Sequence, residues 1–487
     1  MEKYFKKFRK NIVGNNQQFV TPYGVQKMIY ADWVASGRLY EPIEDKIKNE
    51  IGPFVGNTHT ETTLTGTLMT RAYNEAKKII KTHVNAGSED VIIMAGFGMT
   101  GAINKFQRIL GLKGCGKLQK NLCIQDADHP IVFITHMEHH SNQTSWYETI
   151  ADVIIVEAGS DGLPSAENLK SELEKFPNRK HKIGSFTACS NVTGIETNYH
   201  ELAKVMHEFG GLCFIDFAAS APYSDMNMHP ENPLEALDAI YFSPHKFLGG
   251  PGSSGVLIFN KSLYHNISPD NPGGGTVDWT NAWGEYKFVN DIEAREDGGT
   301  PGFLQAIRAA LAIKLKELMG TENIHKREDQ LVAKVFEKTA NIEGLHLLEA
   351  RNKKRCGAIS FYFENVHYNL AVKILNDRYG IQLRGGCACA GTYGHILYGI
   401  SKEESHRITD KINSGDLSEK PGFIRLSLHP TMTNQELETI INAFREISIN
   451  YKLWMQDYDY NKKTNEFNHK SIDESSTKIT NYWFEFD

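Results

Sequence analysis

The chain has 487 residues, and its 53 lysines and arginines are outnumbered by 59 aspartates and glutamates, which gives a formal net charge of −6. This balance leaves no global basic surface, so we expect no nucleic acid partner. No apolar run approaches the ~20 residues of a transmembrane helix, so we expect no membrane partner. Seven mostly scattered cysteines, an odd number, favour free thiols in a reducing compartment, and we expect a cytoplasmic protein.

Short apolar runs alternate with helical patterns from about residue 85 to residue 260. The runs are rich in β-branched residues and nearly all apolar, as in strands that are buried on both faces. The alternation predicts an α/β fold with a large, mostly parallel seven-stranded sheet. The seven runs are residues 91–94, 131–134, 153–156, 183–186, 212–215, 239–242 and 256–259.

The remainder of the chain predicts a second, smaller domain. Residues 345–450 have an α+β pattern that ends in a helix over 433–451. Residues 111–130 and 402–422 look inserted, and the polar C-terminus is expected to be loosely ordered. We predict an N-terminal extension over 1–27, a large α/β domain over 28–310, a linker helix and small α+β domain over 311–451, and a polar tail over 452–487. Packing of the N-terminal part of the large domain with the small domain is the alternative for that part.

A glycine-rich turn follows the first apolar run. Gly96, Gly98 and Gly101 have the GxGxxG spacing between a strand and a helix, a pattern that by itself also fits a plain turn. Free N–H groups and the positive end of the helix dipole hold phosphate there. We expect Gly98, Met99 and Thr100 to bind the phosphate of a dinucleotide or of a smaller cofactor.

Polar residues follow three later runs, at the strand ends where ligands of parallel sheets gather. His139 lies in a histidine-rich segment without HExxH spacing, so we expect it to stack on a cofactor ring and assign no metal ligand. Asn191 can donate to a ring hydroxyl or to a substrate carboxylate, or simply form a turn. Asp216, directly behind a buried strand, is costly unless it is paired, and a protonated ring nitrogen would pair with it.

Lys246 lies in a histidine-flanked, glycine-rich stretch over residues 243–255. Glycines let the backbone pass close to a ligand, and apolar surroundings favour the neutral amine that forms a Schiff base. By itself the lysine is explained equally well as a surface residue of a turn. Together with the phosphate loop, the histidine, the asparagine and the aspartate, it predicts a site for pyridoxal 5′-phosphate (PLP).

These motifs resemble those of the class V, fold-type I PLP enzymes, and most of all the group II cysteine desulfurases and selenocysteine lyases, over about residues 28–448. Residues 137–142 and 243–246 match family motifs closely. The resemblance implies a homodimer in which Thr300 reaches the cofactor phosphate of the neighbouring subunit. It further implies catalytic roles for Lys246 and His139, cofactor binding by Ser243 and His245, and substrate binding by His59, Asn191, Arg384 and Arg425, the last gripping the α-carboxylate.

Residues 383–390 resemble the loop that carries the reactive cysteine of this family, with Arg384, Gly386 and Cys389 at the matching positions. The resemblance implies that Cys389 becomes a persulfide while L-cysteine is converted to L-alanine, and that a sulfur-acceptor protein is a partner. Cys389 also fits an ordinary intracellular thiol. Cys387 has no counterpart and is a second thiol, a disulfide partner or a bystander.

Three departures from the family pattern leave other activities open. Ala219 stands where the family usually has Gln, and Met99 and Gly101 in the phosphate loop stand where it often has Thr and Glu. The insertion near residues 111–130 and the polar tail are additions to the family pattern. The alternative is another class V reaction on a different amino acid, by an aminotransferase, β-lyase, epimerase or selenocysteine lyase. A sulfur carrier with a degenerate site and an NAD-dependent enzyme are further alternatives, although the latter leaves Lys246 and Asp216 without a role.

Overall fold

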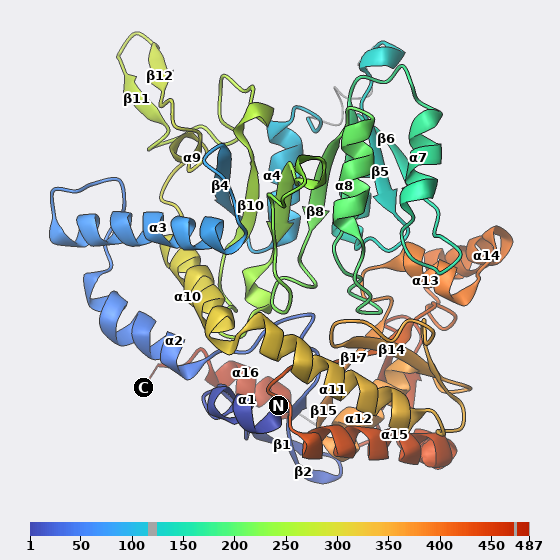
Figure 1. Ribbon diagram of the computed structural model, residues 1–487. Coiled ribbons are helices and arrows are strands. Elements are labelled where there is room, and N and C mark those ends of the chain that lie inside the picture. The colour runs from blue at the N-terminus through green and yellow to red at the C-terminus, as the bar shows by residue number, and fades with distance from the viewer. Residues whose placement is uncertain (115–123, 472–474, 487) are drawn as a thin grey trace. The chain divides into compact units, whose positions relative to one another are not determined.

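The computed structural model describes residues 1–114, 124–471 and 475–486, which divide into two compact units (Figure 1). One, here called the sheet unit, consists of Ala35–Ser190 and Ile195–His325. The other, here called the mixed unit, consists of Met1–Val34, Asn191–Gly194 and Lys326–Asp487. Residues 115–123 of the expected insertion, with two of the seven cysteines, lie outside the described residues.

The seven predicted runs form the central sheet of the sheet unit, in the order β4-β10-β9-β8-β7-β5-β6. Strands β5 to β9 pair in parallel, whereas β10 is antiparallel to both of its neighbours. The prediction of a mostly parallel seven-stranded sheet is therefore confirmed. The strands are β4 (Asp90–Ala95), β5 (Ile131–Thr135), β6 (Asp152–Val156), β7 (Lys182–Thr187), β8 (Leu212–Asp216), β9 (Ala239–Phe242) and β10 (Gly255–Asn260).

Two apolar clusters cover the two faces of this sheet. Helix α4 packs with the cluster that contains Phe106, Trp146 and Phe214, and α8 with the cluster that contains Leu202 and Met206. Burial on both faces explains why the strands show apolar runs rather than alternation. The other elements are α2 (Glu41–Asp45), α3 (Leu64–His83), α4 (Met99–Ile109), α6 (His140–Tyr147), α7 (Ala166–Glu174), α8 (Tyr199–Glu208), β11 (Val277–Thr280), β12 (Tyr286–Phe288), α9 (Ile292–Arg295) and α10 (Phe303–Met319).

The mixed unit has an antiparallel sheet in the order β13-β14-β17-β16, against which α12 and α15 bury their apolar side chains. This is the smaller α+β pattern that the sequence predicts. Its elements are β13 (Leu345–Leu347), β14 (Ala358–Phe363), α12 (Tyr368–Tyr379), β15 (Ile381–Gln382), β16 (Arg384–Gly386), α13 (Gly391–Tyr398), α14 (Lys402–Asn413), β17 (Phe423–Ser427) and α15 (Asn434–Trp454), and α11 (Thr321–Thr339) enters the unit from the sheet unit.

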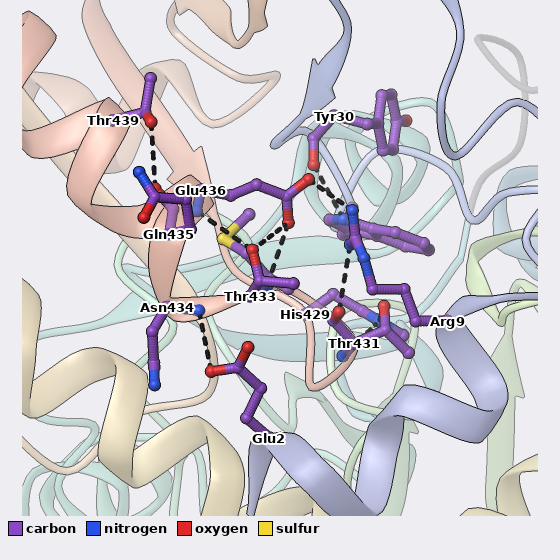
Figure 2. A network of polar contacts seen from close by, with 12 residues as sticks. Glu2, Arg9, Tyr30, His429, Thr431, Thr433, Asn434, Gln435, Glu436 and Thr439 are labelled. Carbon is purple, nitrogen blue, oxygen red and sulfur yellow. Dashed lines mark hydrogen bonds and ion pairs between the residues drawn. The ribbon is translucent and has the colours of Figure 1, made fainter.

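The first 34 residues belong to the mixed unit, with α1 (Glu2–Arg9), β1 (Gln18–Thr21), β2 (Gly24–Lys27) and β3 (Ile29–Tyr30). Strand β3 pairs in parallel with β15. Figure 2 shows how α1 holds the start of α15. The Arg9 guanidinium donates to the carbonyl of Thr431 at 3.1 Å and to Glu436 at 2.6 Å, and Glu436 completes a capping box with Thr433. This network fixes the N-terminal segment.

The C-terminal residues differ from the expectation of loose order, because β18 (Tyr458–Asn461) and β19 (Glu466–His469) form an antiparallel hairpin. Tyr458 is buried, and its hydroxyl donates to Asp377 at 3.1 Å. The apolar side chains of this segment are few and separated by polar ones, so its composition does not predict the hairpin. A final helix, α16 (Ser475–Tyr482), follows it. No helix among the described residues has the length and apolar character to cross a bilayer.

Candidate active site

Lys246 ends a short 3₁₀ turn, Pro244–Lys246, directly after β9. The turn is held by the N–H of Gly37, which donates to the carbonyl of His245 at 2.9 Å. A side chain at position 250 would put its Cβ 1.9 Å from the carbonyl oxygen of Pro244, so Gly250 is required for the chain to fold back here. The glycines of the predicted lysine segment therefore set the position of Lys246.

Asp216 is the last residue of β8, and its side chain is 3% exposed. Its Oδ1 accepts a hydrogen bond from the N–H of Ala218 at 2.8 Å. Burial raises the pKa of Asp216 to about 6, although the Ala218 N–H and the positive charge of Lys246 act in the opposite direction. A buried carboxylate of this kind is stabilised by a cation, as predicted for a ring nitrogen.

The glycine turn after β4 meets the turn before Lys246. Gly98 is the N-cap of α4, and the N–H of Met99 donates to Ser243 Oγ at 2.8 Å. A Cβ on Gly98 would lie 2.8 Å from His245 Cε1 and 3.0 Å from Ser243 Oγ, so this position tolerates only glycine. The structure thus brings together Gly98, Met99, Ser243 and His245 at a helix N-terminus.

Two further contacts complete the turn. Thr100 Oγ1 and Ser141 Oγ are 2.6 Å apart, and His245 Nδ1 lies 2.9 Å from the carbonyl oxygen of Phe97. Burial lowers the pKa of His245, and the charge of Lys246 adds to that shift. A neutral His245 beside Gly98 leaves the helix N-terminus as the anion-binding feature.

His139 is the N-cap of α6, and its Nδ1 accepts a hydrogen bond from the N–H of Ser141 at 3.1 Å. This bond fixes the ring so that Nδ1 is the acceptor and the proton of the neutral ring is on Nε2. The strand-end position that was predicted for His139 agrees with this placement.

Glu138 and Asn142, in the same segment as His139, belong to a buried polar network that the sequence interpretation did not assign to the candidate site. Glu138 is fully buried and accepts hydrogen bonds from Thr135 Oγ1 at 2.6 Å, Asn142 Nδ2 at 2.7 Å and the N–H of Thr187 at 2.9 Å. Burial raises the pKa of Glu138 to about 8 despite these donors, and Asp216 adds to the shift. The sequence does offer a signal for these two residues, because both lie in the motif that contains His139.

In the mixed unit, Asp32 joins the two predicted substrate arginines. Arg425, in β17 and 3% exposed, donates from Nη2 to Asp32 Oδ1 at 2.7 Å and from Nη1 to the carbonyl of Asn191 at 3.1 Å. Arg384 lies directly opposite Arg425 in the β16–β17 ladder and donates from Nε to Asp32 Oδ2 at 3.0 Å. Two guanidinium groups and one carboxylate leave one positive charge, which suits an α-carboxylate.

Cys389 lies in a tight turn from Cys387 to Ala390, closed by a 3.0 Å hydrogen bond from the N–H of Ala390 to the carbonyl of Cys387. Ala388 and Cys389 have φ values of 46° and 57°, a conformation that costs a non-glycine residue about 1 kcal/mol. Asn191 Nδ2 donates to the carbonyl of Ala388 at 2.7 Å and so clamps the turn, while its Oδ1 is buried without a hydrogen-bond partner among the described residues. Cys389 is exposed and Cys387 is half-buried.

His59 and Thr300, the two remaining predicted residues, belong to the sheet unit. The ring of His59 lies against Gly275, where an added Cβ would be 3.2 Å from His59 Cε1. Thr300 is exposed. Within residues 1–114, 124–471 and 475–486, no group of three or more His, Cys, Asp or Glu side chains is arranged to hold a metal ion.

Comparison with known proteins gives a family and a fold. A probable cysteine desulfurase of Staphylococcus aureus strain Mu50 is 27% identical over 370 residues, covering 75% of this chain and 84% of that protein. One of Halalkalibacterium halodurans is 28% identical over 368 residues, covering 74% and 84%.

Among solved structures, the apo cysteine desulfurase from Thermococcus onnurineus NA1 has a TM-score of 0.72 at 23% identity and covers 91% of this chain and 97% of its own. The cysteine desulfurase CsdA (S-sulfonic acid) from Escherichia coli has a TM-score of 0.68 at 21% identity and covers 87% and 94%. These likenesses show the fold-type I architecture. Since the model of the class V aminotransferases matches residues 29–440, the chain belongs to the class V aminotransferase family.

Proposed function

We propose that the protein is a PLP-dependent cysteine desulfurase that converts L-cysteine to L-alanine and takes the sulfur onto Cys389. The observation that carries the proposal is the exposed Cys389 on a strained turn, clamped by Asn191 and following the strand of Arg384. The names of the relatives support the same reaction.

The residues of the sheet unit fit PLP. Buried Asp216 has one backbone donor and suits a protonated ring nitrogen, and the turn at Gly98 has room only for a glycine beside a helix N-terminus. His139 would cover the ring, and Lys246 would hold the cofactor covalently. When bound, PLP supplies an electron-accepting ring that stabilises negative charge on the substrate α-carbon.

The chain's own residues divide the remaining tasks. Arg425 binds the α-carboxylate, and Asp32 orients its guanidinium. Lys246 Nζ takes the proton from the α-carbon of the substrate. His139, whose neutral ring carries its proton on Nε2, moves protons at the other end of the bound substrate and cofactor.

Sulfur transfer needs no outside oxidant. The Cys389 thiolate attacks the Sγ atom of the substrate, a new S–S bond forms, and the Cβ–Sγ bond breaks. The electron pair of that bond stays with the substrate carbon skeleton, which takes up a proton at Cβ and regains the proton at Cα from Lys246 to become L-alanine. The products are L-alanine and a persulfide on Cys389, from which a sulfur-acceptor protein would take the terminal sulfur.

The test is the reaction of purified protein with L-cysteine, followed by assays for alanine, sulfide and protein-bound sulfane sulfur. Cys389→Ser should retain bound PLP and its spectral response to cysteine, because the cofactor residues and Arg425 are unchanged, but should form neither alanine nor persulfide. Cys387→Ser, which removes a thiol from the same turn, is the matched control and should react like the parent. If Cys389→Ser releases alanine at the parent's rate, the proposal is wrong.

A second candidate is another class V reaction on a different amino acid. The buried Ala219 favours it, because the family usually has a Gln there and one hydrogen bond to the cofactor is then missing. Turnover of selenocysteine but not cysteine by Cys389→Ser would favour a selenocysteine lyase, since the weaker carbon–selenium bond needs less help from a thiolate. Pyruvate, an epimer or an amino-group acceptor product would instead favour a β-lyase, an epimerase or an aminotransferase.

A further inference from the structure

The β18–β19 hairpin lies beyond residue 440, where the match to the family model ends. It is paired in register from Tyr458 with His469 to Asn461 with Glu466. Its base is tied to the mixed unit by Tyr23 Oη, which donates to Asp457 Oδ2 at 2.7 Å. The hairpin is therefore a fixed part of the unit that carries Cys389.

Asn465, in the loop of the hairpin, holds the start of α12 with its Nδ2 and its carbonyl, and binds Tyr460 of β18 with its Oδ1. It is 7% exposed and has a φ of 60°, a left-handed conformation that asparagine tolerates better than most residues. Its Nδ2 donates to Tyr368 Oη at 2.6 Å, its carbonyl accepts from Asn369 Nδ2 at 2.6 Å, and its Oδ1 accepts from Tyr460 Oη at 2.9 Å. Three short hydrogen bonds to one buried residue indicate a rigid contact.

Tyr368 passes this contact to the strand before the thiol turn. A Cβ on Gly422 would lie 2.6 Å from the Tyr368 ring and 2.9 Å from Gly386 Cα, and a Cβ on Gly385 would lie 3.1 Å from Tyr368 Cδ2. The ring thus lies directly against the glycine backbone of β16 and its neighbourhood. Burial raises the pKa of Tyr368, and the Cys387 thiol is among the nearby groups that add to this shift.

The strand that Tyr368 supports leads directly into the turn from Cys387 to Ala390. Gly385 and Gly386 have no side chains that could hold β16 in place, so the strand depends on its neighbours for support. One side of β16 is paired with β17, and the turn is clamped by Asn191. Tyr368, fixed by Asn465, is a further support.

We propose that Asn465 is a positioning residue that acts through Tyr368 to hold the thiol-bearing turn in its strained conformation. The hairpin then serves as a brace, and the loss of one hydrogen bond at Asn465 should let the turn open. The link to sulfur transfer depends on the proposed desulfurase function, whereas the link to the turn's conformation does not.

The test is the rate at which iodoacetamide alkylates individual cysteines of the purified full-length protein with PLP added, followed by mass spectrometry and without L-cysteine. Asn465→Ala loses the bonds of its amide to Tyr368 and to Tyr460, of which only the bond to Tyr368 reaches the support of β16. We expect half-buried Cys387 to react about fivefold faster, the change in an opening equilibrium that loss of the Tyr368 bond produces. Tyr368→Phe keeps the ring and removes only the hydroxyl, so Cys387 should react faster there as well. Asn468→Ala, at an exposed asparagine of the same hairpin, is the matched control.

Cys356, which is buried in the same unit, distinguishes positioning from general stability. Its alkylation rate should be unchanged in all three variants. A parallel acceleration of Cys356 overturns the proposal, because the hairpin would then merely stabilise the whole unit. Cys387 rates within twofold of the parent in both Asn465→Ala and Tyr368→Phe also overturn it, and Tyr368→Phe decides the question if Asn465→Ala does not fold.

A second measurement links the brace to turnover. If the desulfurase proposal is correct, Asn465→Ala should lower kcat for L-cysteine with little change in KM, because Arg425 and Asp32 are untouched. A protein without desulfurase activity would still show the alkylation effect, so the two proposals fail independently.

Discussion

At the scale of single residues, Asp216 is the side chain whose surroundings most clearly require a ligand. It is buried at the end of β8 with one backbone donor, and burial raises its pKa to about 6. A protonated ring nitrogen placed against it would lower that pKa, so Asp216 and the cofactor would stabilise each other's charges.

Asp216→Asn keeps the size of the side chain and the acceptor for Ala218 but removes the charge. We expect alanine formation to be at least ~100-fold slower, the usual scale for losing a key charge in an active site. Alanine production and PLP content per chain are the measurements. Asp459→Asn, at an exposed aspartate of β18, should behave like the parent, and an Asp216→Asn enzyme of near-normal rate would contradict the assignment.

Contacts between residues that are far apart in the sequence are the part of the candidate site that the sequence does not predict. Lys246, His139, Asp216 and the glycine turn could be proposed as site residues because each follows a strand signal that is local in sequence, and their roles stay predictions. Asp32 could not, since its partner Arg425 is 393 residues away, and Asn191 clamps Ala388 across 197 residues. Pairs at such separations are created by the tertiary fold and leave no periodic pattern.

At the scale of elements, the N-terminus of α4 and the turn before Lys246 form one structure. The N–H of Met99 is bonded to Ser243 Oγ, and Gly98 has no room for a side chain beside His245. The strand predictions succeeded for a related reason, since strands covered on both faces must be apolar throughout. The C-terminal hairpin was not predicted, because its few apolar residues are separated by polar ones and form no apolar run.

Gly98→Ala should weaken PLP binding, because the new methyl group would push Ser243 and His245 away from the helix N-terminus. The measurement is the PLP concentration that half-saturates visible absorbance, and we expect it to rise at least tenfold, as for the loss of ~1.4 kcal/mol. Gly114→Ala is the matched control, because a Cβ there meets nothing within 4 Å. Unchanged PLP affinity in Gly98→Ala would rule out this turn as the phosphate site.

At the scale of the whole molecule, the sheet unit has exposed apolar side chains that a homodimer, as predicted, would cover. Phe97, beside the phosphate turn, is 88% exposed, and Ile267 and Trp283 are 90% and 84% exposed. Large exposed apolar groups are characteristic of protein interfaces. Thr300 is itself exposed, and its contact with the partner subunit's phosphate stays a prediction.

Thr300→Ala should therefore lower PLP retention while the protein still sediments as a dimer, because the dimer is held by apolar contacts and only the phosphate contact is lost. Dilution of the parent to monomer should release PLP and activity together. Sedimentation velocity with detection of cofactor absorbance measures both effects. A monomer that keeps PLP and full activity would refute the shared site.

The inclusion of residues 1–34 in the mixed unit has a consequence for synthesis. These residues leave the ribosome long before their partners, because Ala31 bonds to Ser427 and Asp32 to Arg425, which emerge about 390 residues later. At ~5–20 residues per second, the segment waits roughly 20–80 seconds for its partners. During that interval Phe5, Phe8 and Trp33, all buried in the finished protein, have no native surface to cover them. We therefore expect nascent chains of this protein to need protection by chaperones that bind apolar segments.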